Sequence, residues 1–217
     1  SHFHFPHGQV HVKIEVAGKL MYSGIVRDIN VQKRAAEDSA RRAVAVESLY
    51  GIAARSELNL KEKLLAALAL GSEHFSMPVA FITRVEGDVC RLEYALGPPG
   101  SPTSGTEMPL ASTPCEKVWR SARSVGITDI AGEDCCHRDY GLRSYLGAPL
   151  LVGGQMYGSL SFASMESRDE EFAPGDLAIA HSFAEWMGNE ITRDVTQTEL
   201  SERAERMRSI LDNVADG

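Results

Sequence analysis

Apolar residues at every second position mark the first element that the sequence predicts. Residues 10–16 read VHVKIEV, and this alternation predicts a strand that buries one face. A turn at residues 17–19 and a second apolar run at residues 20–29 follow, so the two runs predict a hairpin. Because an isolated hairpin is only marginally stable in water, we expect it to pack on the rest of the chain or to be the remnant of a larger domain.

Helical spacing replaces this alternation from Asn30 onward. Residues 30–56 are polar and rich in alanine, and they contain no proline. Ala36, Ala43 and Tyr50 recur at heptad-like spacing with Val46 between them, which predicts a helix that pairs with another helix over a narrow seam.

The middle of the chain predicts a mixture of helices and strands. Asn59 is a typical N-cap for a helix over residues 60–75. Residues 79–85 and 89–96 predict a second hairpin. Residues 97–109 contain three glycines and four prolines, which predicts a loop.

A short helix and a glycine-containing hairpin complete the middle part. Ser112 or Thr113 is placed to cap a helix that carries Pro114 in its first turn. Residues 125–130 predict a short strand, and residues 144–164 predict a hairpin around a Gly-Gly turn.

The first strand of this last hairpin has two different faces. Tyr145 and Gly147 lie on one side of it, whereas Leu146 and Ala148 lie on the other. One side therefore faces a helix-covered core and the other faces a second layer, where we expect any small-molecule ligand to bind.

Residues 173–214 predict one long helix that carries two apolar spacings. The first spacing recurs every four residues, as on a helix that lies against a core: Phe183, Met187, Ile191 and Val195. The second spacing alternates steps of four and three: Leu200, Ala204, Met207, Leu211 and Val214. Alternating steps of four and three define a heptad seam, so the end of this helix predicts a coiled coil between two chains.

The overall composition narrows the classes of function. The chain has 217 residues, of which 43% are hydrophobic, and its formal net charge is −8. Such an acidic chain lacks the basic face that nucleic acid or an anionic membrane surface requires. No apolar run in the sequence is long enough to span a bilayer, so we expect a soluble protein with neither of these partners.

The cysteines indicate a reducing compartment. Cys90, Cys115, Cys135 and Cys136 occur in a chain that is too large and too poor in cysteine to depend on disulfides. The sequence has no C-x-x-C pair, so we expect no structural zinc site. No rigid element holds together the histidines near the start, His2, His4, His7 and His11, so we expect no designed metal site there either. We interpret the four cysteines as reduced thiols of a cytoplasmic protein.

The sequence carries none of the common catalytic motifs. It has no P-loop, no G-x-S-x-G elbow, no H-E-x-x-H helix and no G-x-G-x-x-G after a strand. We therefore expect a non-catalytic binding module.

The glycine-containing hairpin also carries a family resemblance. Residues 143–164 read RSYLGAPLLVGGQMYGSLSFAS, preceded by PCEKV at 114–118 and ITDI at 127–130. This pattern resembles that of GAF domains in bacterial sensor proteins. The resemblance implies an α+β fold, with a six-stranded antiparallel sheet, helices on both faces and long signalling helices at both ends.

The two ends of the chain resemble parts of a different sensory domain. Residues 24–30, GIVRDIN, resemble the last strand of a PAS domain, and residues 207–217 resemble the lead-in to another. These resemblances imply that the chain is an excised segment of a multi-domain sensor, such as a histidine kinase or a cyclic-dinucleotide enzyme. The expected parts are a truncated PAS hairpin at 1–30, a linker helix at 31–57, a GAF domain at 58–195 and a coiled-coil linker at 196–217.

A cluster of reactive residues at 133–140 leaves several interpretations open. Cys135, Cys136 and His137 suit thiolate activation, haem or metal ligation, or covalent bilin attachment at Cys136. Bilin-binding GAF domains carry a Cys-His pair ahead of the corresponding strand. The alternative is that Cys135 packs inward as a small hydrophobic residue while His137 faces solvent.

The expected function is a non-catalytic sensory relay that forms a homodimer through its flanking helices. The alternative is a bilin, haem or thiol-based sensor centred on Cys135, Cys136 and His137. The sequence does not identify a cofactor or ligand. The candidate ligand-binding residues are Cys115, Trp119, Asp129, Cys136, His137, Arg143 and Tyr145.

Overall fold

The computed structural model describes residues 9–16, 19–27, 30–131 and 140–215. The chain divides into two compact units, residues 1–41 and residues 42–217. The first unit contains an antiparallel hairpin of β1 (Gln9–Val16) and β2 (Lys19–Arg27). This pairing confirms the hairpin that the alternation predicts, and its origin in a PAS domain stays a prediction. α1 (Asn30–Ala53) begins in the same unit.

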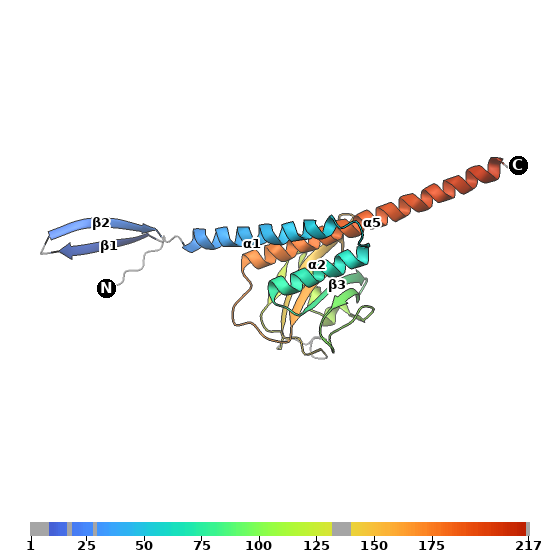
Figure 1. Ribbon diagram of the computed structural model, residues 1–217. Helices are drawn as coiled ribbons and strands as arrows, with labels where there is room; N and C mark the ends of the chain where they lie inside the picture. The colour runs from blue at the N-terminus through green and yellow to red at the C-terminus, as the bar shows by residue number, and fades with distance from the viewer. Residues whose placement is uncertain (1–8, 17–18, 28–29, 132–139, 216–217) are drawn as a thin grey trace. The chain divides into compact units, whose positions relative to one another are not determined.

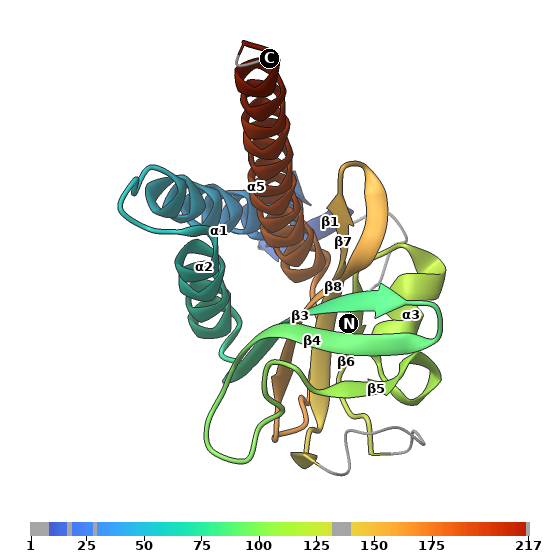
Figure 2. The ribbon, with the colours of Figure 1, turned by 90° about the vertical axis from the view of Figure 1, so that its right-hand side faces the viewer.

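A six-stranded sheet forms the centre of the second unit (Figure 2). The strands lie in the order β5-β4-β3-β8-β7-β6, and neighbouring strands pair antiparallel. Their bounds are β3 Val79–Glu86, β4 Val89–Leu96, β5 Glu107–Pro109, β6 Val125–Ile127, β7 Ser144–Val152 and β8 Gln155–Ser164. The predicted α+β fold with a six-stranded antiparallel sheet is thus confirmed.

Helices cover both faces of this sheet. α2 (Leu60–Phe75) and α5 (Pro174–Ala215) lie on one face, and the short α3 (Cys115–Ser121) lies on the other (Figures 1 and 2). α2 begins at the predicted cap. The backbone N–H of Glu62 donates to Asn59 Oδ1 at 3.0 Å, and the backbone N–H of Asn59 donates to Glu62 Oε2 at 2.9 Å. Together these two bonds form a capping box.

Two predictions for the middle part are wrong. The predicted loop 97–109 contains β5, which pairs with β4 over only three residues and is too short to show an alternating pattern. The predicted side-chain cap of α3 is absent, because Pro114 stands at that N-cap without a side-chain hydrogen bond. Instead, the hydroxyls of Ser112 and Thr113 donate to carbonyl oxygens of the preceding turn at 2.8 Å each.

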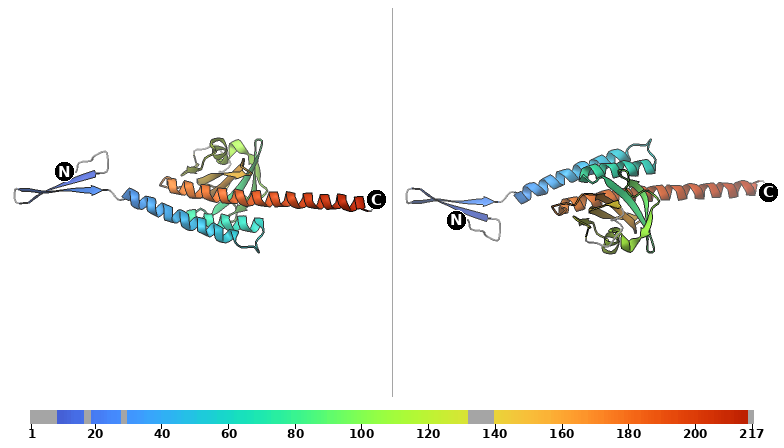
Figure 3. Two further views of the ribbon diagram at one scale, coloured as in Figure 1. Left: turned by 90° about the horizontal axis from the view of Figure 1, so that it is seen from above. Right: turned by 90° about the horizontal axis from the view of Figure 1, so that it is seen from below.

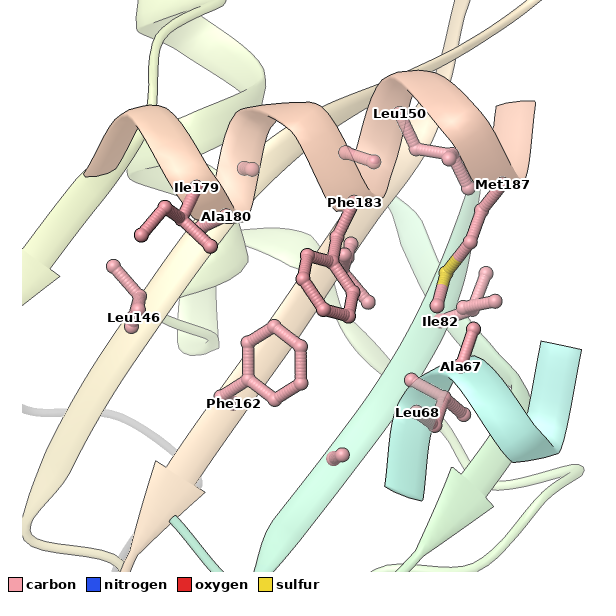
Figure 4. Packing of buried hydrophobic residues seen from close by; sticks show 14 of the residues in the cluster. Ala67, Leu68, Ile82, Leu146, Leu150, Phe162, Ile179, Ala180, Phe183 and Met187 are labelled. Carbon is pink, nitrogen blue, oxygen red and sulfur yellow. The ribbon is translucent and has the colours of Figure 1, made fainter. Parts of the chain in front are cut away.

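The main core lies between the sheet and the helices α2 and α5 (Figure 4). Leu146 and Leu150 of β7 are fully buried there, as the two-faced pattern of that strand predicts. The ring of Phe162 lies 4.9 Å from that of Phe75 and meets the ring of Phe183 edge to face at 6.3 Å. Each fully buried side chain of this size contributes about 1.5–3 kcal/mol of hydrophobic stabilisation.

The second half of α1 joins this core through residues that are not part of the predicted seam, so the pairing of that seam with another helix stays a prediction. Ala45 and Leu49 are 4% and 1% exposed and belong to the main core. Ala43 and Tyr50, two residues of the predicted seam, are exposed. The heptad spacing of α1 therefore does not mark the face that packs on its own domain.

α5 is one uninterrupted helix with a buried and an exposed half (Figure 3). Phe183, Met187 and Ile191 are buried in the core as predicted, whereas Val195, predicted to continue this stripe, is 44% exposed. Beyond it the helix extends past the sheet, where Leu200 is 60% exposed. Among the helices in the described part of the chain, none is long and apolar enough to cross a membrane.

Candidate functional site

The second face of the sheet carries its own buried layer, closed by α3 and by the segments that flank it. Its buried apolar members are Val79, Phe81, Cys90, Leu92, Leu110, Cys115, Val118, Ile130, Leu142, Tyr145 and Ala163. They come from β3, β4, β7, β8, α3 and the connecting segments. This is the layer in which the sequence predicts a ligand site.

A cluster of hydroxyl groups lies inside this layer, and we call it the hydroxyl cluster: Thr83, Tyr145, Ser159 and Ser161. The Oγ atom of Ser161 lies 2.9 Å from the Tyr145 hydroxyl and 3.1 Å from the Oγ atom of Ser159. The Oγ atom of Ser159 lies 2.8 Å from Thr83 Oγ1. Each residue of the cluster is at most 2% exposed, so this is a fully buried chain of hydrogen bonds.

Sheet register brings the cluster together. Thr83 of β3 pairs directly with Ser159 of β8. Ser159 and Ser161 are two residues apart on β8, so their side chains lie on the same face. Gly147 of β7 pairs with Ser161, and the Tyr145 hydroxyl covers the site where a side chain at position 147 would begin, 2.2 Å from its Cβ. A glycine at position 147 therefore makes room for the tyrosine.

Cys115 joins the hydroxyl cluster from α3. Its Sγ atom lies 3.9 Å from the Oγ atom of Ser161, and it is 3% exposed. A hydrogen bond with Cys90 is the largest influence on this thiol, and it lowers the pKa of Cys115 to about 6 although burial acts in the opposite direction. Burial, followed by the charge of Cys115, raises the pKa of Tyr145 well above 10.0.

The structure brings together only some of the predicted ligand-binding residues. Cys115 and Tyr145 meet through Ser161, and the half-buried Trp119 packs against the same layer. Asp129 and Arg143 instead form an ion pair that is 42% and 43% exposed.

That ion pair is bidentate and lies apart from the hydroxyl cluster. Arg143 Nε donates to Asp129 Oδ1 at 2.9 Å, and its Nη2 donates to Oδ2 at 2.7 Å. Asp129 also accepts a bond from the backbone N–H of Ala131 at 2.9 Å. The pair holds together the segments before and after residues 132–139. The remaining predicted residues, Cys136 and His137, lie outside the described residues, as does Cys135.

Sequence reasoning missed the polar core of this layer. Thr83, Ser159, Ser161 and Cys90 were not among the predicted site residues. Ser159 and Ser161 occupy alternate positions within residues 158–163, GSLSFA, whose other members are apolar or small, and this pattern of hydroxyls inside a buried strand is the signal that could have identified them.

A second polar group lies at the rim of a surface groove of about 540 Å³. The Tyr157 hydroxyl donates to Glu93 Oε2 at 2.6 Å, and the guanidinium of Arg84 lies over the Tyr157 ring at 5.4 Å. Burial and this hydrogen bond raise the pKa of Tyr157.

Within residues 9–16, 19–27, 30–131 and 140–215, the structure contains no group of three His, Cys, Asp or Glu side chains placed to hold a metal ion.

Known proteins place this arrangement in context. Residues 59–191 match the model of the family described as GAF domain. Among curated proteins, none matches the chain in sequence.

Several solved structures are similar in fold. A GAF domain of a phosphoenolpyruvate-protein phosphotransferase from Coxiella burnetii is 15% identical with a TM-score of 0.61, over 74% of this chain and 98% of that one. The free methionine-R-sulfoxide reductase of Neisseria meningitidis, solved with its substrate, is 20% identical with a TM-score of 0.59, over 73% and 93%. A phycoerythrobilin-bound GAF domain of a cyanobacterial phytochrome is 14% identical with a TM-score of 0.58, over 74% and 99%. At these identities the similarity concerns the fold.

Proposed function

The chain belongs to the GAF domain family, and we propose that it is a non-catalytic sensory module that relays a signal through its flanking helices. In this proposal the domain is part of a bacterial multi-domain signalling protein and works as a homodimer. The observation that carries the proposal is the division of α5 into a half that forms the core of the domain and a half that leaves it.

A shift of the core reaches the end of the chain through α5. Phe183 and Met187 are fully buried against the sheet. No proline interrupts the helix between these residues and Ala215, so the helix transmits a displacement along its axis as one stiff element.

A groove between α1 and α5 supports pairing with a second copy. It has a volume of about 250 Å³, and its lining includes Tyr50 of α1 together with Ser182, Trp186 and Asn189 of α5. Tyr50 is 67% exposed beside it.

The predicted seam of α5 continues the face that lines this groove. Leu200, Ala204 and Met207 each follow a groove residue of α5 by eighteen positions, namely Ser182, Trp186 and Asn189, whereas the fourth groove residue of α5, Glu185, is followed by Arg203. Eighteen residues are five helical turns, so each pair lies on the same side of the helix. Leu200 and Met207 are 60% and 59% exposed. The exposed seam beyond the domain therefore extends the side of α5 that lines the groove.

Sedimentation equilibrium tests the dimer. We expect the chain to be dimeric and Leu200→Glu to raise the dissociation constant at least about 100-fold, because two unpaired carboxylates would enter the seam. Thr198→Glu is the matched control, since it adds the same charge on the opposite side of α5. A monomeric wild-type chain, or equal weakening by both substitutions, would contradict the proposal.

A cofactor or redox sensor is the second candidate. A GAF domain of similar fold is bound to phycoerythrobilin, and this chain has a Cys-His pair at residues 136–137. A visible absorbance band, or a mass above that of the polypeptide, in the purified chain supports this candidate. The sequence mass with a colourless spectrum supports a relay without a bound chromophore.

An enzymatic role is tested separately. The fold similarity to a free methionine-R-sulfoxide reductase defines the substrate to use. We expect no turnover of free methionine-R-sulfoxide with a thiol reductant. Turnover that is lost in a cysteine variant would contradict the non-catalytic proposal.

A further inference from the structure

Cys90 and Cys115 are distant in sequence and converge in the second layer. Cys90 lies in β4, and Cys115 is the first residue of α3. Both lie in the same buried layer, 0% and 3% exposed, and neither forms a disulfide in the structure. The side chain of Cys90 is the largest cause that lowers the pKa of Cys115. Neither thiol belongs to the relay proposed above, and neither is a member of the Cys135–Cys136 pair.

The surroundings of Cys115 favour a reactive thiol. Besides Cys90, its sulfur faces the Oγ atom of Ser161 at 3.9 Å, and the hydroxyls of Tyr145 and Ser159 are hydrogen-bonded to that Oγ atom. These groups stabilise the thiolate and lower the pKa of Cys115 to about 6. The thiolate is the nucleophilic form of cysteine, so Cys115 is the one of the two that attacks an oxidant.

We propose that Cys115 and Cys90 are a redox modification site that a peroxide converts into a disulfide. In the first step the Cys115 thiolate attacks one peroxide oxygen. The O–O bond breaks, a sulfenic acid forms, and the other oxygen leaves as water after taking up a proton. In the second step the sulfur of Cys90 attacks the Cys115 sulfur, its proton passes to the leaving hydroxyl, and water departs. Two thiols and one hydrogen peroxide thus give one disulfide and two waters.

The fold can accommodate this change without leaving the hydroxyl cluster unsatisfied. Ser161 keeps its bonds to Tyr145 and Ser159 when Cys115 turns toward Cys90. The new disulfide would link β4 to α3. The part of the chain between the two cysteines would contain β5, the strand at the edge of the sheet. Because Cys115 is only 3% exposed, the natural oxidant is a small one, of the size of hydrogen peroxide.

The test uses the full chain with Cys135→Ser and Cys136→Ser, so that Cys90 and Cys115 are its only thiols. The reduced protein is treated with hydrogen peroxide, unfolded in urea with an alkylating agent, and measured by intact mass. We expect loss of both alkylation sites, their recovery with a reductant, and a disulfide between tryptic peptides 85–91 and 92–117. Two alkylated thiols after treatment of a chain that circular dichroism shows to be folded would overturn the proposal.

Single variants assign the two roles. In the same background, Cys90→Ser should leave Cys115 as a sulfenic acid that dimedone captures, because no second thiol resolves it. Cys115→Ser should leave Cys90 unmodified. Cys115→Ala repeats the second measurement if the serine variant does not fold. Dimedone labelling of Cys90 instead of Cys115 would overturn the assignment.

Discussion

The contact between α5 and β7 offers the sharpest test of the fold. Gly188 of α5 lies against the backbone of β7, and a Cβ atom at this position would be 2.1 Å from the carbonyl oxygen of Leu151. Real Cβ atoms keep at least 3.0 Å from such neighbours, so Gly188→Ala requires α5 to withdraw by about 1 Å from a close-packed sheet.

The expected cost follows from two opposing effects. Overpacking of this kind costs about 1–3 kcal/mol, and more where the neighbour is backbone. Replacing a helical glycine with alanine stabilises the helix by about 1 kcal/mol because alanine has the higher helix propensity. We therefore expect Gly188→Ala to lower the free energy of unfolding by about 2 kcal/mol, which is about 4–8 °C in Tm for a unit of this size.

Gly51 of α1 provides the matched control. A Cβ at this position would meet nothing within 4 Å, so the same substitution causes no overpacking and only raises the helix propensity of α1. We expect Gly51→Ala to stabilise the chain by about 0.5–1 kcal/mol. Thermal and urea unfolding followed by circular dichroism measure both variants. If Gly188→Ala proves as stable as Gly51→Ala, α5 does not lie on β7 as described.

Three further substitutions test individual interactions. Asn59→Ala removes the capping box and should cost about 1 kcal/mol in urea unfolding, and an unchanged midpoint would contradict the cap. Ser161→Ala leaves the buried Tyr145 hydroxyl without its partner and should cost about 1–3 kcal/mol, whereas a variant as stable as wild type would show that the hydroxyl cluster is not a structural network. Tyr157→Phe should cost stability at neutral pH because the bond to Glu93 is lost. The folded-state pKa of Tyr157 is raised, so this bond contributes fully below pH 10 and is lost as the pH rises further. The difference between Tyr157→Phe and wild type should therefore shrink above pH 10, and a constant difference would contradict the assigned cause.

Much of the fold could be predicted from the sequence because burial imposes simple periods. Tyr145 and Leu146 lie on opposite faces of β7, and two-residue alternation is sufficient to place them there. Asn59 with Glu62 three residues later is a local signal that depends on no distant partner. Phe183 and Met187 repeat every four residues because one face of α5 lies on the sheet.

The features that could not be predicted depend on contacts between residues that are distant in the sequence. β5 consists of three residues that owe their conformation to pairing with β4. The hydroxyl cluster exists because the register of β3 and β8 puts Thr83 opposite Ser159, whereas serine in a strand is usually interpreted as a solvent-facing residue. Tyr50 fits a heptad pattern but is exposed, because the neighbouring residue Leu49 is the one that packs into the main core.

The central claim is that a change in the domain moves the far half of α5 in a dimer. Spin labels carried by an unnatural amino acid at exposed position 202 would report the distance between the two copies of α5 by pulsed electron paramagnetic resonance. We expect a single intermolecular distance in wild type and in Gly51→Ala, and a shifted or broadened distribution in Gly188→Ala, which displaces α5 from the sheet. The absence of an intermolecular distance, or the same distribution in all three proteins, would contradict the relay.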